Sequence, residues 1–256
     1  MTVVRSAVFF LWFALVSASL SLLGVPALLL DRRVVVLLSR TWSRATLWGL
    51  RAIVGLDYEI RGPIPPKRIL IASKHMSMWD TIALYLFLDD PTVVIKRELL
   101  RIPFYGWMAW KAGVISIDRS GRAPTLKRMV QEARSAIAEG RAILIFPEGH
   151  RMRPGAPPEY KAGVAALYSQ LDVSCVPVAL NSGLFWTGPA GFLKKPGRIV
   201  VQFLDPIPSG LRPREFLQKL ETRIETATAT LLKEGYTILS HGEGASTAEH
   251  AARPRA

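Results

Sequence analysis

Hydrophobic and polar positions divide the chain into a long apolar N-terminal stretch, a series of short alternating segments and a polar C-terminal stretch. Residues 6–30 contain no charged side chain, and Gly24 and Pro26 interrupt the end of this run. Residues 6–23 predict a helix of roughly 27 Å at 1.5 Å per residue. Because the hydrocarbon core of a bilayer is about 30 Å thick, such a helix is close to the length that spans a membrane.

A row of arginines follows the apolar run and falls within about 40° of arc on a helix: Arg33, Arg40, Arg44 and Arg51. Aliphatic and Trp side chains lie on the opposite side of the same helix, at Val35, Leu38, Trp42 and Ala45. This pattern predicts a helix in the membrane interface, with a surface helix packed on the domain as the alternative. We expect residues 1–50 to anchor the protein, by spanning the membrane or by entering one leaflet. The positive-inside tendency then places the rest of the chain on the cytoplasmic side of the inner membrane.

From Arg51 onward, short apolar runs alternate with amphipathic segments. The apolar runs predict strands at 58–61, 68–72, 92–95, 114–117, 141–146, 175–180 and 199–204. The intervening segments predict helices after Asp80, up to Lys111, and at 124–140, 162–171 and 214–233. Strands that alternate with helices predict an α/β fold, with a mainly parallel sheet flanked by helices.

The expected organisation is a set of N-terminal membrane-anchoring helices at 1–50, an α/β domain at 51–235 and a tail at 236–256. The end of the chain is rich in Gly, Ala, Ser, His and Arg and shows no apolar period, so we expect the tail to be disordered.

Charge and cysteine content restrict the classes of partner and site. The chain carries 33 Lys and Arg against 20 Asp and Glu, a formal net charge of +13. This charge favours an anionic partner, which includes a phosphate-bearing substrate, an acidic lipid surface, an acidic protein and nucleic acid. Cys175 is the single cysteine, so no disulfide framework is possible, and the 4 histidines show no zinc spacing. We therefore expect no metal.

His75 and Asp80 are the candidate catalytic pair. They lie between an apolar run that reads as a buried strand, 69–72, and a second run that reads as a helix, 82–86. Ligands of open α/β sheets usually bind at the carboxyl ends of the strands. A neutral imidazole there can accept a hydroxyl proton while a carboxylate holds its tautomer. The alternative interpretation is structural: Ser77 and Asp80 would form a capping box, which requires no catalysis.

Basic residues recur just after the predicted strand ends: Lys96 and Arg97, Arg119 and Arg122, and Arg151 and Arg153. If the strands are parallel, these ends share one edge of the sheet with His75, and their cations would bind a phosphate. Glu148 and Gly149 predict a tight turn beside them. The sequence contains neither a Gly-x-Ser-x-Gly elbow nor a phosphate-binding Gly-rich Lys-Ser/Thr loop. The histidine would then activate a hydroxyl of the substrate itself, which points to acyl transfer onto a phosphorylated lipid alcohol.

Four segments occur in a recognisable order: His-x4-Asp at 75–80, a strand ending in Asp-Arg at 113–119, Phe-Pro-Glu-Gly-x-Arg at 146–151 and an apolar strand with an early proline at 176–180. Between the first two lies Lys-Arg-Glu-Leu at 96–99, followed by Ile102 and Pro103. This ordered set resembles the glycerolipid acyltransferases, the family typified by 1-acyl-glycerol-3-phosphate acyltransferase, over roughly residues 55–210. His150 departs from the family pattern, in which Thr or Ser is usual between Gly and Arg.

The resemblance implies a membrane-bound enzyme that works in one step without a cofactor. His75, oriented by Asp80, would act as general base on the sn-2 hydroxyl of 1-acyl-glycerol-3-phosphate (lysophosphatidate). The hydroxyl would attack the thioester of a donor, acyl-CoA or acyl-carrier protein, and the product would be phosphatidate. The partners implied are therefore a membrane lipid and a thioester donor, with no nucleic acid.

The resemblance also implies roles in binding for residues at the other strand ends. Lys96, Arg119 and Arg151 would hold the phosphate of the acceptor, and Glu148 and Gly149 would shape that site. Two alternatives remain open: an O-acyltransferase for another lyso-lipid, such as a lyso-aminolipid, and a non-catalytic protein that binds membranes or anions.

Overall fold

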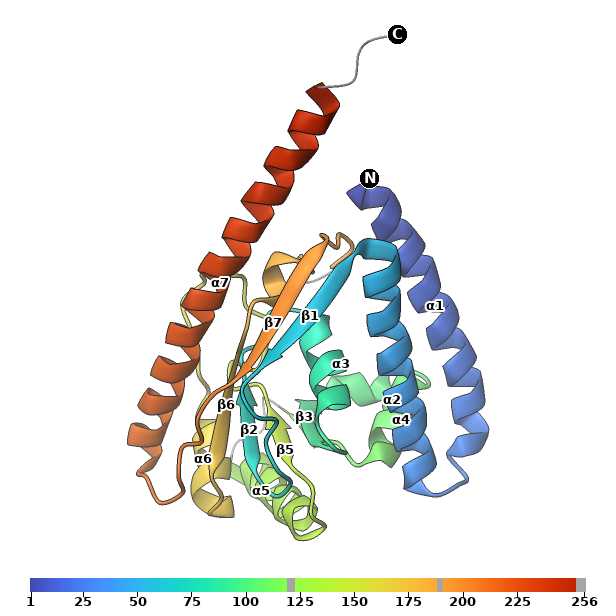
Figure 1. Ribbon diagram of the computed structural model, residues 1–256. Helices are drawn as coiled ribbons and strands as arrows, with labels where there is room; N and C mark the ends of the chain where they lie inside the picture. The colour runs from blue at the N-terminus through green and yellow to red at the C-terminus, as the bar shows by residue number, and fades with distance from the viewer. Residues whose placement is uncertain (119–122, 188–190, 252–256) are drawn as a thin grey trace.

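A central sheet organises the computed structural model, which describes residues 1–118, 123–187 and 191–251 (Figure 1). Within these ranges the sheet has seven strands in the order β1-β7-β6-β2-β5-β3-β4. The strands are β1 (Leu56–Arg61), β2 (Leu70–Ser73), β3 (Thr92–Lys96), β4 (Ile115–Ile117), β5 (Ile143–Ile145), β6 (Cys175–Leu180) and β7 (Gly197–Phe203). Each predicted strand is present, which confirms the α/β prediction.

From β6 through β2, β5 and β3 to β4, each strand pairs in parallel with the next. The β7 strand runs antiparallel to β6 and pairs in parallel with β1, so the sheet is mainly parallel, as predicted. The inner strands β2, β5 and β6 are buried along their whole length, because helices cover both faces of the sheet. Their near-continuous apolar sequences follow from that burial.

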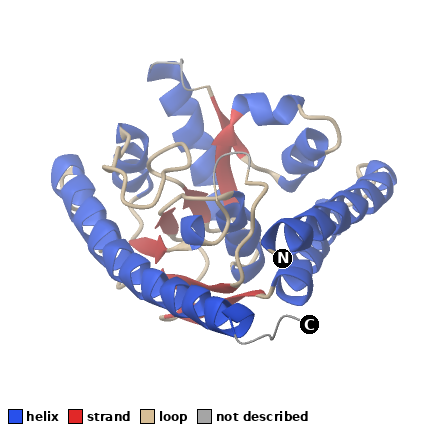
Figure 2. Ribbon diagram, turned by 90° about the horizontal axis from the view of Figure 1, so that it is seen from above, coloured by secondary structure: helices blue, strands red, loops and turns tan. Residues whose placement is uncertain are grey.

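Helices form a layer on each face of the sheet (Figure 2). One layer packs with β1, β7 and alternate residues of the inner strands. It contains α1 (Thr2–Ala27), α2 (Arg32–Gly49), the π-helix Leu50–Val54, α3 (Met78–Phe87) and α4 (Tyr105–Ala112). The opposite layer contains α5 (Ala123–Ala138), α6 (Ala162–Leu171) and α7 (Pro213–Ala251). Two short 3-10 helices, Arg97–Arg101 and Ser182–Leu184, follow β3 and β6.

The two N-terminal helices pack side by side along the domain (Figure 1). The Trp42 indole of α2 donates a hydrogen bond to Ser17 of α1, and Val35 of α2 is fully buried. Arg40, one of the predicted stripe of arginines, donates to the carbonyl of Leu88 at 2.7 Å. The apolar side of α2 thus packs within the protein, as the surface-helix alternative described, and most exposed apolar side chains of this region belong to α1.

The last helix is longer than predicted. We expected it to end near Lys233 and expected a disordered tail from residue 236, whereas α7 continues to Ala251. Its packed part includes Phe216 and Leu231, while Tyr236 and Ile238 are exposed. An established helix extends at little cost per residue where no proline intervenes, so its end is not marked by the loss of apolar packing. Residues 252–256 lie outside the described residues, and the division at 50 and 235 stays a prediction.

Gly106 provides a test of how closely α4 packs on the segment before it. A Cβ atom at this position would lie 2.0 Å from the Leu100 carbonyl oxygen, which is backbone and cannot rotate away. We expect Gly106→Ala to lower the free energy of unfolding by about 1–3 kcal/mol through overpacking. Denaturant unfolding of the purified protein measures this change.

Gly163 is the matched control, because it also lies in a helix but a Cβ there would meet Met129 at an ordinary 3.7 Å. Gly163→Ala should keep or raise stability, by up to about 1 kcal/mol from helix propensity. Equal losses in both variants would contradict the packing described at Gly106.

Candidate active site

The turn between β2 and α3 carries the predicted catalytic pair. Strand β2 ends at Ser73, α3 begins at Met78, and Ser77 is its N-cap residue. Ser77 and Asp80 form the capping box that the sequence offered as the structural alternative. The box and the pair are compatible, because Asp80 uses the same carboxylate to cap α3 and to contact His75.

The carboxylate of Asp80 is fully buried and is surrounded by hydrogen-bond donors. Its Oδ2 accepts the backbone N–H groups of Met76 at 2.6 Å and Ser77 at 2.9 Å. Its Oδ1 accepts the hydroxyl of Ser182 and lies 3.2 Å from the Ser77 hydroxyl. A carboxylate that collects these bonds is an acceptor only, so the group that faces it must be a donor.

The imidazole of His75 is the remaining donor to the Asp80 carboxylate. Its Nδ1 lies 2.9 Å from Asp80 Oδ2, and the ring stacks on Phe146 with 4.0 Å between centroids. Since Asp80 only accepts, Nδ1 carries the hydrogen and Nε2 presents a lone pair. Within residues 1–118, 123–187 and 191–251, Nε2 makes no hydrogen bond, and 12% of the side chain is exposed. The geometry therefore orients the imidazole and leaves Nε2 accessible, as a general base requires.

The backbone of His75 is fixed on both sides by the segment that follows β5. The N–H of His75 donates to Glu148 Oε2 at 3.3 Å, and its carbonyl accepts the N–H of Met152 at 2.8 Å. Gly149 adopts a positive φ of 71° in the turn that its N–H closes on the Phe146 carbonyl at 2.9 Å. This left-handed conformation suits glycine and lets the segment fold back over His75.

Glu148 points into the protein rather than toward solvent. Its Oε1 lies 2.6 Å from the ammonium group of Lys74, which also bonds both carboxylate oxygens of Glu225 at 2.8 and 3.0 Å. Burial raises the pKa of Glu148, and the hydrogen bond and charge of Lys74 oppose that rise. The carboxylate thus acts on the site through Lys74 and the backbone of His75, and its predicted part in shaping an acceptor site stays a prediction.

The predicted phosphate-binding cations lie at the same edge of the sheet, as far as the structure describes them. Lys96 is the exposed last residue of β3, paired in register with Ile117 of β4. Arg119 lies outside the described residues. Arg151 is exposed next to Met152, and its charge opposes the rise that burial causes in the pKa of Tyr105. Their binding of a phosphate stays a prediction.

The sequence did not identify Ser182, Lys74, Glu225 or Tyr160. Ser182 follows β6 and is separated from Asp80 by 102 positions, with no local pattern that marks it. Lys74 directly follows the fully buried strand β2, and a buried lysine needs an anion as its partner. Glu225 and Tyr160 are bonded to each other at 2.9 Å and belong to an amphipathic helix and a loop, where such residues are common.

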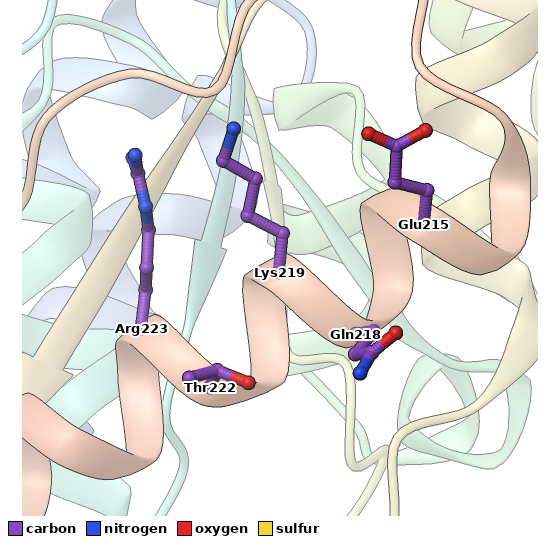
Figure 3. Close-up of a pocket in the computed structure, with 5 residues that line it drawn as sticks. All are labelled: Glu215, Gln218, Lys219, Thr222 and Arg223. Atoms are coloured by element: carbon purple, nitrogen blue, oxygen red, sulfur yellow. The ribbon is translucent and has the colours of Figure 1, made fainter.

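A hollow on the surface of α7 is separate from this site. A shallow hollow runs along one side of α7 and is lined by residues of that helix alone (Figure 3): Glu215, Gln218, Lys219, Thr222 and Arg223. None of them belongs to the His75 site.

Among the described residues, no group of three or more His, Cys, Asp or Glu side chains is placed to hold a metal ion. The expectation of no metal stays a prediction.

Comparison with known proteins decides the family. A sequence model of the family described as "Acyltransferase" matches residues 56–181. The 1-acyl-sn-glycerol-3-phosphate acyltransferase alpha of Ovis aries is 30% identical over 206 residues, which cover 78% of this chain and 70% of that protein. The chain belongs to the acyltransferase family. The matched range contains His75, Asp80 and the 146–151 segment, whereas Ser182 lies directly after it.

Two further comparisons agree with this family. The 1-acyl-sn-glycerol-3-phosphate acyltransferase of Pseudomonas aeruginosa is 38% identical over 164 residues, and the match spans 63% of this chain and 63% of that relative's length. The crystal structure of the 1-acyl-sn-glycerophosphate (LPA) acyltransferase of Thermotoga maritima superposes with a TM-score of 0.75, at 17% identity, covering 90% of this chain and 98% of that one. It has the same fold.

The network around Asp80 predicts a measurable stability contribution. Asp80→Asn places a donor amide among groups that are themselves donors, so we expect a loss of about 2–3 kcal/mol in the free energy of unfolding. Ser182→Ala removes one bond to the carboxylate and should cost about 1.5 kcal/mol. Chemical denaturation followed by circular dichroism measures both.

Ser169 is the control, because it is exposed on α6 and its hydroxyl donates a hydrogen bond within its own helix, to the Ala166 carbonyl at 3.3 Å. Ser169→Ala should change stability by less than about 0.5 kcal/mol. An Asp80→Asn variant as stable as the native protein would show that the charge of the carboxylate does not hold this turn together.

Proposed function

We propose that the protein is a membrane-bound acyltransferase that converts 1-acyl-glycerol-3-phosphate to phosphatidate in phospholipid synthesis. It would transfer a fatty acyl group from a thioester donor to the sn-2 hydroxyl. The observation that carries the proposal is the His75–Asp80 pair, with Nδ1 held at 2.9 Å and Nε2 unpartnered among the described residues. The relatives named 1-acyl-sn-glycerol-3-phosphate acyltransferase support the choice of acceptor.

The proposed reaction needs one base and no covalent intermediate. Nε2 of His75 accepts the proton of the sn-2 hydroxyl as its oxygen attacks the thioester carbonyl. The new carbon–oxygen bond forms, the carbon–sulfur bond breaks, and the departing thiolate takes the proton back from the imidazolium. Asp80 stabilises the imidazolium without accepting the proton. Its oxygens already accept hydrogen bonds from the N–H groups of Met76 and Ser77 and from the hydroxyl of Ser182.

The phosphate of the acceptor would be bound by Lys96, Arg119 and Arg151. The register of β3 and β4 supports this arrangement, because Lys96 pairs with Ile117 two positions before Arg119. Arginine and lysine donors match a phosphate in charge and geometry. Glu148 and Gly149 would shape this site through the turn that carries Arg151. The donor would be acyl-CoA or acyl-carrier protein, used as a substrate.

A second acceptor remains a candidate because of His150. This residue stands where the family pattern has Thr or Ser, and its exposed ring lies 3.8 Å from Glu159. A changed residue at this position leaves room for an acceptor such as a lyso-aminolipid, whereas the cationic strand ends favour the phosphate. A non-catalytic anion-binding protein would have no use for an oriented His75.

Membrane association forms part of the proposal. Helix α1 is long and apolar enough to cross a membrane, with a mean hydropathy of 2.2 and 11% of its apolar window buried. Both ends of the helix nevertheless contact the domain: Ser6 bonds the backbone of Lys194 at 3.0 Å, and Gly24 packs on Met108. A helix attached to the domain near both ends supports insertion into one leaflet. The positive-inside tendency supports a catalytic domain on the cytoplasmic side.

The role of His75 as general base can be tested by substitution. Purified native protein in liposomes, given lysophosphatidate with acyl-CoA or acyl-carrier protein, should form phosphatidate. His75→Ala should lower kcat by about 10²–10⁴-fold, the usual contribution of a general base, while folding and vesicle binding persist. His241, near the C-terminal end of α7, supplies the control, and His241→Ala should keep native activity. Native activity in His75→Ala would refute the mechanism.

The depth of α1 can be tested by labelling. Cysteines are introduced singly at Thr2, the first residue of α1, and at Asp31, beyond its other end. They are labelled with a membrane-impermeant maleimide after the protein binds sealed vesicles. The native Cys175 adds little background, because it is fully buried and burial raises the pKa of its thiol. A helix in one leaflet exposes both positions on the outside. Labelling of only one of them would show that α1 spans the bilayer.

A further inference from the structure

A buried ion cluster connects α7 to the backbone of the proposed catalytic histidine. Lys74 lies directly before His75, and its ammonium group is enclosed between the carboxylates of Glu148 and Glu225. The side chain of Lys74 is 2% exposed and that of Glu148 is fully buried. Tyr160 completes the cluster by donating its hydroxyl to Glu225 Oε1 at 2.9 Å.

The order of contacts leads from α7 to His75. Glu225 binds Lys74 with both carboxylate oxygens, Lys74 binds Oε1 of Glu148, and Oε2 of Glu148 accepts the His75 N–H. Each link is a hydrogen bond in which at least one partner is charged, and such bonds are stronger than neutral ones. The side chain of Lys74 has freely rotating bonds, so a single carboxylate would fix its position less well than the two that enclose it.

The charges explain why Glu225 matters to this arrangement. Two carboxylates face a single ammonium group, and the hydroxyl of Tyr160 supplies the additional donor. Burial raises the pKa of Tyr160, and the charge of Glu225 raises it further, so the phenol keeps its hydrogen and remains a donor. Without Glu225, Lys74 would be attracted by Glu148 alone, and its position would no longer be set by α7.

Glu225 lies outside the range of residues 56–181 that the family model matches. Glu225 also differs from Glu234 of the same helix. Glu234, which lies further along α7, pairs with Arg61 at 2.9 Å near the surface, and neither residue is bonded to the His75 region. Glu234 is therefore a suitable control for Glu225: both are charged residues of α7 in ion pairs, and only Glu225 contacts the residues around His75.

We propose that Glu225 is a positioning residue for catalysis, acting through Lys74 and Glu148 on the backbone of His75. This inference rests on the proposed function, in which His75 is the general base. Helix α7 then contributes to the site without touching substrate, and Tyr160 holds Glu225 in the orientation that Lys74 requires. Because a displacement of about 1 Å in a reacting group can cost roughly 100-fold in rate, the loss of this link should appear in kcat.

The main experiment compares Glu225→Gln with Glu234→Gln in the full-length protein bound to liposomes. Glu225→Gln should lower kcat by about 10–100-fold and change KM for lysophosphatidate and for the donor by less than about threefold. Glu234→Gln should keep native kinetics. A changed KM with native kcat would overturn the proposal, because Glu225 would then act in binding, and so would native kinetics in Glu225→Gln.

A double-mutant cycle tests whether Glu225 acts through Lys74. In a Lys74→Met background, the added Glu225→Gln should cause no further loss of kcat, whereas independent effects would multiply. If Lys74→Met does not fold, a second cycle uses Tyr160→Phe, which alone should lower kcat by about threefold and should add no loss to that of Glu225→Gln. Multiplying losses in the cycle that is measured would overturn the proposed order of contacts.

Hydrogen exchange supplies a measurement that needs no substrate. The amide hydrogen of His75 is donated to Glu148, so Glu225→Gln should speed its exchange at least about tenfold, while Glu234→Gln leaves it unchanged. If the native protein forms no phosphatidate, the proposed function fails, and the exchange rates still decide the positioning of His75. Native exchange of this amide in Glu225→Gln would overturn the inference.

Discussion

The requirement to satisfy one buried carboxylate organises the site. An ionised group removed from water costs several kcal/mol unless donors replace the lost hydration. Asp80 meets this requirement with the backbone of residues 76 and 77, with Ser182, and with the Nδ1 hydrogen of His75. The turn must wind around the carboxylate to bring these groups together, and this winding leaves Nε2 of His75 accessible. Helix capping and catalytic geometry are thus consequences of the same interaction.

The parallel sheet supplies the remaining order. Strands β2 and β5 are neighbours with Ala72 opposite Ile145, so the segment that leaves β5 necessarily passes beside the turn that leaves β2. That segment places the Phe146 ring against the imidazole, and Glu148 and Met152 against the two backbone groups of His75. Segments separated by about 70 positions in the sequence become one site because they occupy the same edge of the sheet. The helices cover the two faces of the sheet, and ligands of open α/β sheets usually bind at this edge.

Much of the fold could be predicted from sequence, because local patterns record it. Apolar runs marked the strands, and Ser77 with Asp80 marked the start of α3. The pair His75–Asp80 was recognisable because a short turn brings its members together. Ser182 and Glu225 were not, since each reaches the site by tertiary packing alone, and a serine in a loop or a glutamate on a helix has no distinctive pattern. The arginine stripe on α2 was misleading for a related reason: the periodicity reveals a polar and an apolar side, and both protein and membrane can cover the apolar side. The extent of α7 depends on helix propagation, which apolar periodicity does not record.

The central claim is that Asp80 holds His75 in the tautomer that carries its hydrogen on Nδ1. Nitrogen NMR of protein labelled at histidine nitrogens, recorded at a pH where His75 is neutral and assigned with His75→Ala, measures this directly. We expect a protonated Nδ1 and an unprotonated Nε2 in the native protein, and loss of this preference in Asp80→Asn. A native signal showing hydrogen on Nε2 would contradict the account, because the nitrogen that faces the substrate could then accept no proton.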